Sequence, residues 1–163
     1  MTVRSETARL AAVPVAGAAV IAGLVWWSGI PLSSASVPPG EVTLEAEARG
    51  ATLEVVSLLP GEEISQQLSI SNGASVRSKL AMAETAAPSE VSDGALRLRI
   101  ERDDVEVYDG QFGAMADFWA EQGWIDAGGY VEYTFTVSLP PDADPVTEGS
   151  QVASAVYTWE TDP

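Results

Sequence analysis

Apolar and polar residues alternate one by one along most of the chain after Gly40, and this period of two constrains the fold more than any other feature. In the longest run, Val131–Leu139, each apolar residue is separated from the next by one mostly polar residue. Successive strand side chains point to opposite faces, so such a run makes one apolar and one polar face. Comparable runs lie at 42–46, 53–59, 64–70, 76–82, 96–100 and 152–159. We therefore predict an all-β fold in which two antiparallel sheets form a sandwich.

Turn-forming pairs separate these runs. They are Pro60-Gly61, Asn72-Gly73, Asp93-Gly94, Asp103-Asp104, Asp109-Gly110, Gly128-Gly129 and Pro140-Pro141. Asn-Gly and Asp-Gly tolerate the positive φ of tight hairpins, so we predict tight turns at these pairs. One segment departs from the pattern. In Met115–Gly123 the apolar residues fall at helical spacing, which predicts a short helix or helical lid over one end of the sandwich.

The start of the chain has the layout of a secretory signal peptide. Arg4 and Arg9 precede an apolar run, Leu10–Trp27, and small residues follow up to Ala35. This order predicts a signal helix within residues 1–35 that is cleaved after Ala35. The alternative is a retained N-terminal membrane anchor, because this run would measure about 27 Å as a helix. Either way, residues 36–163 form a single domain that is secreted or held at the cell surface.

Composition narrows the partners and the chemistry. The net charge is −16, which argues against nucleic acid as a partner, so membrane contact is expected only through an uncleaved N-terminal segment. The chain has no cysteine and therefore no disulfides, and no histidine. The H-E-x-x-H zinc motif and any Ser-His or Cys-His relay are thereby excluded. We expect no enzyme and no cofactor, with calcium as the one exception considered.

That exception rests on a proline-rich acidic loop. Asp142, Asp144 and Glu148 bring carboxylate oxygens within a few residues of one another. Calcium accepts six to eight oxygen ligands from loops of this kind. The alternative is a solvated acidic turn that the prolines stiffen.

Tryptophans and arginines are the other candidate contact residues. Trp119, Trp124 and Trp159 suit either a carbohydrate-stacking platform or core packing, and Trp124 is expected to be the most exposed. Arg97 and Arg99 share the polar face of one strand. Acidic residues on neighbouring strands would pair with them, or they would contact an acidic patch of a second copy.

Three segments carry a resemblance to a known family. The first is Leu58–Glu62 (LLPGE), followed by a strand to Ile70 and a turn at Ser71–Ser75. The second is Val107–Gly110 (VYDG), and the third is Gly129–Pro140 continuing to Gly149–Glu160. In this order they resemble the TasA/CalY family of exported bacterial surface and biofilm-matrix proteins, which includes camelysin.

The resemblance implies a jelly-roll sandwich, export, and assembly into matrix fibres by strand addition, with self-assembly or other matrix proteins as partners. The segment available as a donated strand is Gly40–Ala48, which makes Val42, Leu44 and Ala46 candidate assembly residues. Two alternatives remain. One is a monomeric surface-displayed module that binds carbohydrate or protein. The other is a camelysin-like peptidase, against which the missing histidine argues.

Overall fold

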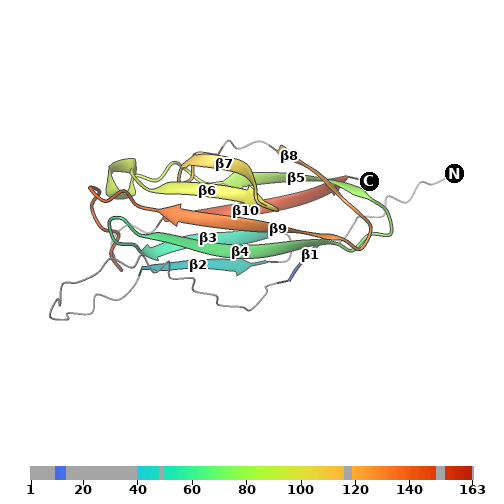
Figure 1. The fold of residues 1–163 in the computed structure, drawn as a ribbon, viewed down its shortest axis with the longest axis horizontal. Helices are drawn as coiled ribbons and strands as arrows, with labels where there is room; N and C mark the ends of the chain where they lie inside the picture. The colour runs from blue at the N-terminus through green and yellow to red at the C-terminus, as the bar shows by residue number, and fades with distance from the viewer. Residues whose placement is uncertain (1–9, 14–39, 48–49, 116–118, 150–152, 163) are drawn as a thin grey trace, which may run out of the picture.

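The fold is a two-layered β-sandwich (Figure 1). The structure is a computed structural model that describes residues 10–13, 40–47, 50–115, 119–149 and 153–162. Within these ranges the strands are β1 (Leu10–Val13), β2 (Glu41–Ala46), β3 (Gly50–Ser57), β4 (Glu63–Asn72), β5 (Ser78–Thr85), β6 (Arg97–Arg102), β7 (Val105–Gln111), β8 (Ala120–Ile125), β9 (Tyr130–Ser138) and β10 (Ala153–Asp162). A short 3₁₀ turn, η1 (Val91–Gly94), is the helical element of the described residues.

The strands are connected as in a jelly roll. Sheet A has the order β1-β4-β9-β6-β7, and sheet B has the order β2-β3-β10-β5-β8, with all pairings antiparallel. From β3 to β10 the chain passes from one sheet to the other at every connection except the β6–β7 hairpin. These eight strands form the roll, while β1 and β2 extend one edge of each sheet. The predicted antiparallel, jelly-roll-like sandwich is confirmed.

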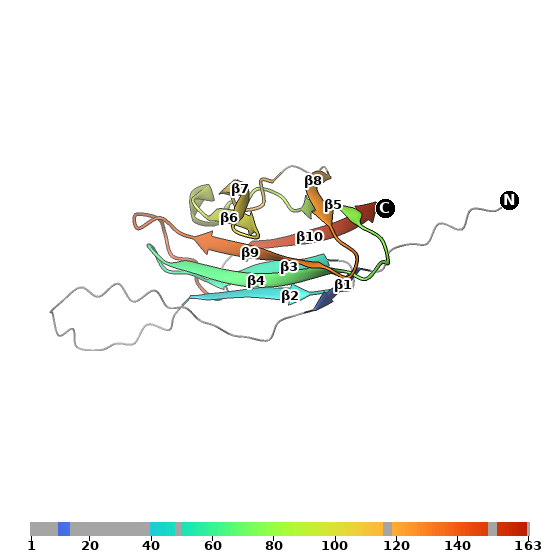
Figure 2. The same ribbon diagram turned by 45° about the vertical axis from the view of Figure 1, so that its right-hand side comes forward.

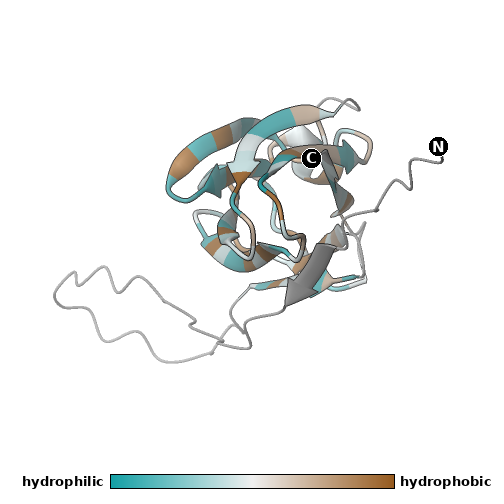
Figure 3. Cartoon of the chain, turned by 90° about the vertical axis from the view of Figure 1, so that its right-hand side faces the viewer, coloured by the Kyte–Doolittle hydropathy of each residue, from teal (hydrophilic) through white to brown (hydrophobic). Residues whose placement is uncertain are grey.

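The core lies between the inner faces of the two sheets. Apolar and polar residues alternate along the strands in the view of Figure 3. The central strands β9 and β10 carry four buried aromatic side chains, and Phe135 packs on Tyr157 with ring centroids 4.9 Å apart. Tyr133 and Trp159 lie 5.4 Å apart in the same way. Burial of these large apolar side chains supplies much of the free energy that stabilises the folded chain. The chain has no disulfide that could add to it.

The two N-terminal strands lie on the same side of the sandwich (Figure 2). Strand β2 pairs with β3 in sheet B, and β1 pairs with the last part of β4 in sheet A. A side-chain hydrogen bond joins the two layers here, because Gln66 Nε2 of β4 donates to the carbonyl oxygen of Val42 in β2 at 2.7 Å. This side chain holds the start of β2 against the neighbouring sheet.

The helix predicted for Met115–Gly123 is wrong. Ala120–Ile125 forms strand β8, which pairs with β5 at the edge of sheet B. Residues 116–118 lie outside the described residues. A segment this short fits both a helical and a strand period, and pairing with the exposed edge of β5 decides between them. The register between β5 and β8 shifts at a β-bulge between Leu80 and Ala81, which accommodates the irregular apolar pattern of β8.

The start of the predicted signal helix is also different. Leu10–Val13 is strand β1, paired with Ser69–Asn72 of β4. The remainder of the apolar run, together with Ser33–Ala35, lies outside the described residues, so cleavage or retention stays a prediction. The edge of β4 offers backbone N–H and C=O groups, and the four residues Leu10–Val13 pair with them.

The turn predictions have mixed outcomes. Asp103 and Asp104 form the β6–β7 hairpin turn, with φ of 47° and 64°. Asp109-Gly110 is not a turn, because both residues lie inside β7 and pair with Arg99 and Leu98. Asn72 is the last residue of β4 and Gly73 begins the connection to β5, while Asp93-Gly94 lies in the connection from β5 to β6. Both connections lead from one sheet to the other, so neither pair closes a hairpin. Local turn propensity cannot reveal which sheet receives the next strand.

Candidate functional site

Strand β2 is one of the two edge strands of sheet B in the described part of the chain, and it carries three predicted assembly residues. Val42 is buried, and Leu44 and Ala46 pack partly against the core. Glu47 N–H donates to the carbonyl oxygen of Gly50, the first residue of β3, so alternation turns the backbone groups of Leu44 and Ala46 away from β3. The side chains of Val42, Leu44 and Ala46 therefore belong to the chain's own core. The backbone N–H and C=O groups of Leu44 and Ala46 point away from the sheet.

Strand β4 is the corresponding edge of sheet A. It has ten residues, and β1 pairs only with its last four, Ser69–Asn72. Asn72 N–H donates to the Gly129 carbonyl beside β9, so alternation turns the N–H of Ser69 toward the β1 side. Among the described residues, Glu63–Leu68 of β4 have no strand partner on that side. Among the described strands, β4 is therefore the outermost strand of sheet A over Glu63–Leu68.

Arg97 and Arg99 lie on the outer face of sheet A, as predicted. They line a hollow of about 260 Å³ together with Glu63, Asp109 and Thr136. Arg97 Nη2 lies 3.1 Å from Asp109 Oδ1 on the neighbouring strand β7, which confirms the expected cross-strand pair. Arg99 Nε lies 3.8 Å from Glu101 on its own strand. The carboxylates neutralise both guanidinium groups, so the hollow is polar without being strongly cationic.

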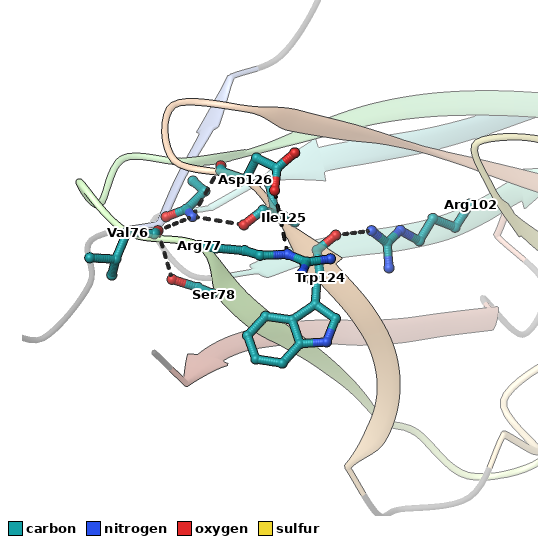
Figure 4. A network of polar contacts seen from close by, with 8 residues as sticks. Val76, Arg77, Ser78, Arg102, Trp124, Ile125 and Asp126 are labelled. Atoms are coloured by element: carbon teal, nitrogen blue, oxygen red, sulfur yellow. Dashed lines mark hydrogen bonds and ion pairs between the residues drawn. The ribbon is translucent and has the colours of Figure 1, made fainter.

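Trp124 is exposed at the end of β8 and belongs to a polar network that joins the two sheets (Figure 4). Arg102 Nη2 of β6 donates to the Trp124 carbonyl oxygen at 2.9 Å. The Arg77 guanidinium carbon lies 4.9 Å from the indole centroid, and Arg77 Nε lies 3.4 Å from Asp126. The Trp124 carbonyl thus links the two sheets through Arg102, while the Arg77 guanidinium covers one face of the Trp124 indole ring.

Asn72 anchors the same end from inside. Its side chain is buried, and Nδ2 lies within hydrogen-bonding distance of the carbonyl oxygens of Val76, Ile125 and Asp126 (Figure 4). Its Oδ1 accepts from Ala74 N–H at 3.0 Å. Sequence reasoning treated Asn72 as a turn residue and missed this role. A polar residue in phase with the buried positions Leu68 and Ile70 of β4 was the available signal.

The acidic loop does not form a metal cluster in the described part of the chain. Asp142, Asp144 and Glu148 lie between β9 and β10. The described residues contain no group of three or more histidine, cysteine or acidic side chains that could hold a metal ion. The Asp144 carbonyl oxygen accepts a hydrogen bond from the Ser92 hydroxyl, so the loop is fixed through its backbone. The calcium hypothesis gains no support from this arrangement.

A buried carboxyl group was not predicted. Glu84 of β5 lies in the core, and its Oε1 accepts a hydrogen bond from the Tyr157 hydroxyl at 2.7 Å. Burial raises the pKa of Tyr157, and the negative charge of Glu84 raises it further. The pKa of Tyr108 is raised for the same two reasons in the same order. Glu84 continues the buried phase of Leu80 and Met82, which was the signal in the sequence.

The comparisons give no relative from which a function could be transferred. No protein-family model matches the sequence, and no curated protein matches it either. Among the described residues, no helix is both long and apolar enough to cross a membrane. The strand edges, surfaces and hollows of this chain are therefore the features that bear on its function.

Proposed function

We propose that the chain is an exported, non-enzymatic structural protein of the cell surface or extracellular matrix, whose copies join by strand addition. The observation that carries the proposal is the pairing of β1 with the edge of β4. A segment remote in sequence adds to this edge, and its described residues pair with four of the ten β4 residues. Strand addition of this kind joins chains through backbone hydrogen bonds.

Processing of the leader would expose this edge. Leu10–Val13 lies within the predicted signal peptide, so cleavage after Ala35 would remove β1, the strand that pairs with β4 on the side away from β9. A strand from a neighbouring copy would then take its place, since unpaired edges are templates for pairing. The resemblance to the TasA/CalY family is consistent with this proposal and supports it as an expectation only.

The donor strand we propose is Gly40–Ala48 of the neighbouring copy. In the described chain its residues 41–46 pair with β3, and the carbonyl of Val42 is held by Gln66. Donation therefore requires β2 to leave β3 of its own copy and to pair with β4 of another copy, in the place of β1. After donation, the Val42 side chain would be buried in the core of the neighbouring copy.

The test compares the full chain with a chain that starts at Ser36. Light scattering after size exclusion and negative-stain microscopy should show filaments for the shorter chain and monomers for the full chain. Deletion of Ser36–Ala48 should abolish the filaments. Both chains remaining monomeric at high concentration, with sandwich-like circular dichroism, would contradict the proposal.

A pair of variants locates the acceptor edge. Ser69→Pro removes an N–H that faces the edge, and proline is tolerated at such edge positions. We expect it to prevent assembly of the shorter chain. Ser69→Ala keeps the N–H and removes only the hydroxyl, so it should assemble normally. Equal assembly of both variants would place the contact elsewhere.

A further inference from the structure

A hollow on the outer face of sheet B has a different character from the one beside the arginines. It measures about 340 Å³ and lies across β8, β5 and β10. Ala81 occupies its middle and pairs with Glu121 on one side and Glu160 on the other. The small side chain between two long ones explains the depression, since directly opposed residues of a sheet project on the same face.

Trp119 lines this hollow and is 43% exposed. An indole ring is usually buried for most of its area, because it contributes a large apolar surface. In contrast, none of the described residues that line the hollow beside Arg97 is aromatic. The hollow on sheet B therefore combines an exposed apolar ring with polar groups, which is the composition of a small-molecule binding site.

The polar groups around Trp119 are mainly hydrogen-bond acceptors. Glu121 and Glu160 contribute carboxylates, and Lys79 contributes an ammonium group that forms an ion pair with Glu121. Two carboxylates against one ammonium leave the hollow negative, and the whole chain carries −16. An acidic polymer would be repelled, whereas a neutral ligand with many hydroxyl groups could donate to the carboxylates.

We infer that this hollow binds a segment of neutral polysaccharide, with Trp119 as the stacking side chain. The C–H face of a pyranose ring packs on the indole, and its hydroxyl groups donate to Glu121 and Glu160. The volume lies at the lower end of the range for ligand pockets, about 300–1,000 Å³, which suits one or two sugar units of a longer chain. This site is independent of the β4 edge, so copies joined by strands would still present it.

The experiment titrates the full chain with the β-1,4-linked glucose hexamer and the α-1,4-linked glucose heptamer, using calorimetry and tryptophan fluorescence. We expect binding of at least one of them and no binding of the galacturonic acid hexamer. Trp119→Ala should weaken the affinity at least about tenfold, as removal of a central aromatic contact does. Trp119→Phe should retain part of it.

Trp124→Ala is the matched control. Trp124 is 45% exposed, similar to Trp119, but does not line the hollow, so its variant should bind like the wild type. Equal losses in both tryptophan variants would overturn the proposal, as would unchanged binding by Trp119→Ala. Failure of both glucans to bind at millimolar concentration would also overturn it. Trp119-dependent binding of casein peptides without glucan binding would assign the hollow to peptides instead.

Discussion

The Tyr157 hydroxyl donates a hydrogen bond to Glu84 Oε1 at 2.7 Å. Both side chains are buried, and the two residues are directly paired on β10 and β5. This pair places a carboxyl group inside a mainly apolar core. Burial and the nearby carboxylate raise the pKa of Tyr157 above its ordinary value of 10.0, and burial raises the pKa of Tyr133 as well.

The first prediction concerns alkaline pH. In the unfolded chain these tyrosines ionise near their ordinary pKa, whereas in the folded chain they stay protonated to higher pH. The folded state thus binds more protons above about pH 10, so the free energy of unfolding is unaffected below this pH and falls above it. Urea unfolding between about pH 8 and about pH 11 should show the decrease. Tyr157→Phe should make the decrease shallower, and an unchanged slope would contradict the assignment.

The second prediction concerns Glu84 itself. Glu84→Gln keeps an oxygen that can accept from Tyr157 while removing any buried charge, so stability at neutral pH should stay within about 1 kcal/mol of the wild type or rise. Glu84→Ala leaves the Tyr157 hydroxyl without this acceptor and opens a cavity, at a cost of about 2 kcal/mol or more. Chemical denaturation of both variants measures the difference. Equal destabilisation would show that the hydrogen bond is unimportant.

The third prediction concerns Asn72. Asn72→Ala removes the donor shared among three carbonyl oxygens and should lower the free energy of unfolding by at least about 2 kcal/mol. Asn72→Asp preserves size and the acceptor for Ala74, but it directs an oxygen at carbonyl oxygens. It should therefore be at least as destabilising as alanine at neutral pH. Thermal unfolding followed by circular dichroism tests this order, and a stable aspartate variant would refute it.

The fourth prediction compares two arginines. The Arg102 side chain is only 15% exposed and joins the two sheets through the Trp124 carbonyl, so Arg102→Ala should cost about 1.5–3 kcal/mol. Arg97 forms a half-exposed pair with Asp109 on the outer face. Arg97→Ala should cost less than about 1 kcal/mol, because exposed ion pairs contribute little. Urea midpoints decide between them, and equal losses would mean that the inter-sheet bond carries no special weight.

The fifth prediction concerns the attachment of β2. Gln66→Ala removes the bond to the Val42 carbonyl and should destabilise the chain by about 1 kcal/mol. Amide exchange should accelerate in β2 more than in β9. If β2 is the donated strand, the chain starting at Ser36 should also assemble faster with this substitution. Gln67→Ala, at an exposed neighbouring position, serves as the control and should change neither property.

Much of the fold could be predicted from local pattern. Val131–Leu139 alternates without interruption, its residues up to Ser138 lie in strand β9, and its apolar residues are buried. The pairing of Arg97 with an acidic residue on the next strand also followed from charge pattern. In contrast, Met115–Gly123 was too short to distinguish a helical period from a strand period. The edge of β5, remote in sequence, determined the outcome.

The candidate sites depended more strongly on tertiary structure. Ala81, Glu121 and Glu160 lie on three different strands, and only the order β8-β5-β10 brings them into one hollow. Strand order is set by which edges pair after collapse, and single-sequence alternation carries no information on it. The sequence by itself determined most of the strands from β2 to β10, their buried faces and the acidic net charge, because these follow from periodicity and composition. Only the tertiary structure decided which strand edges stay open and which side chains meet, because these depend on contacts between residues far apart in the chain.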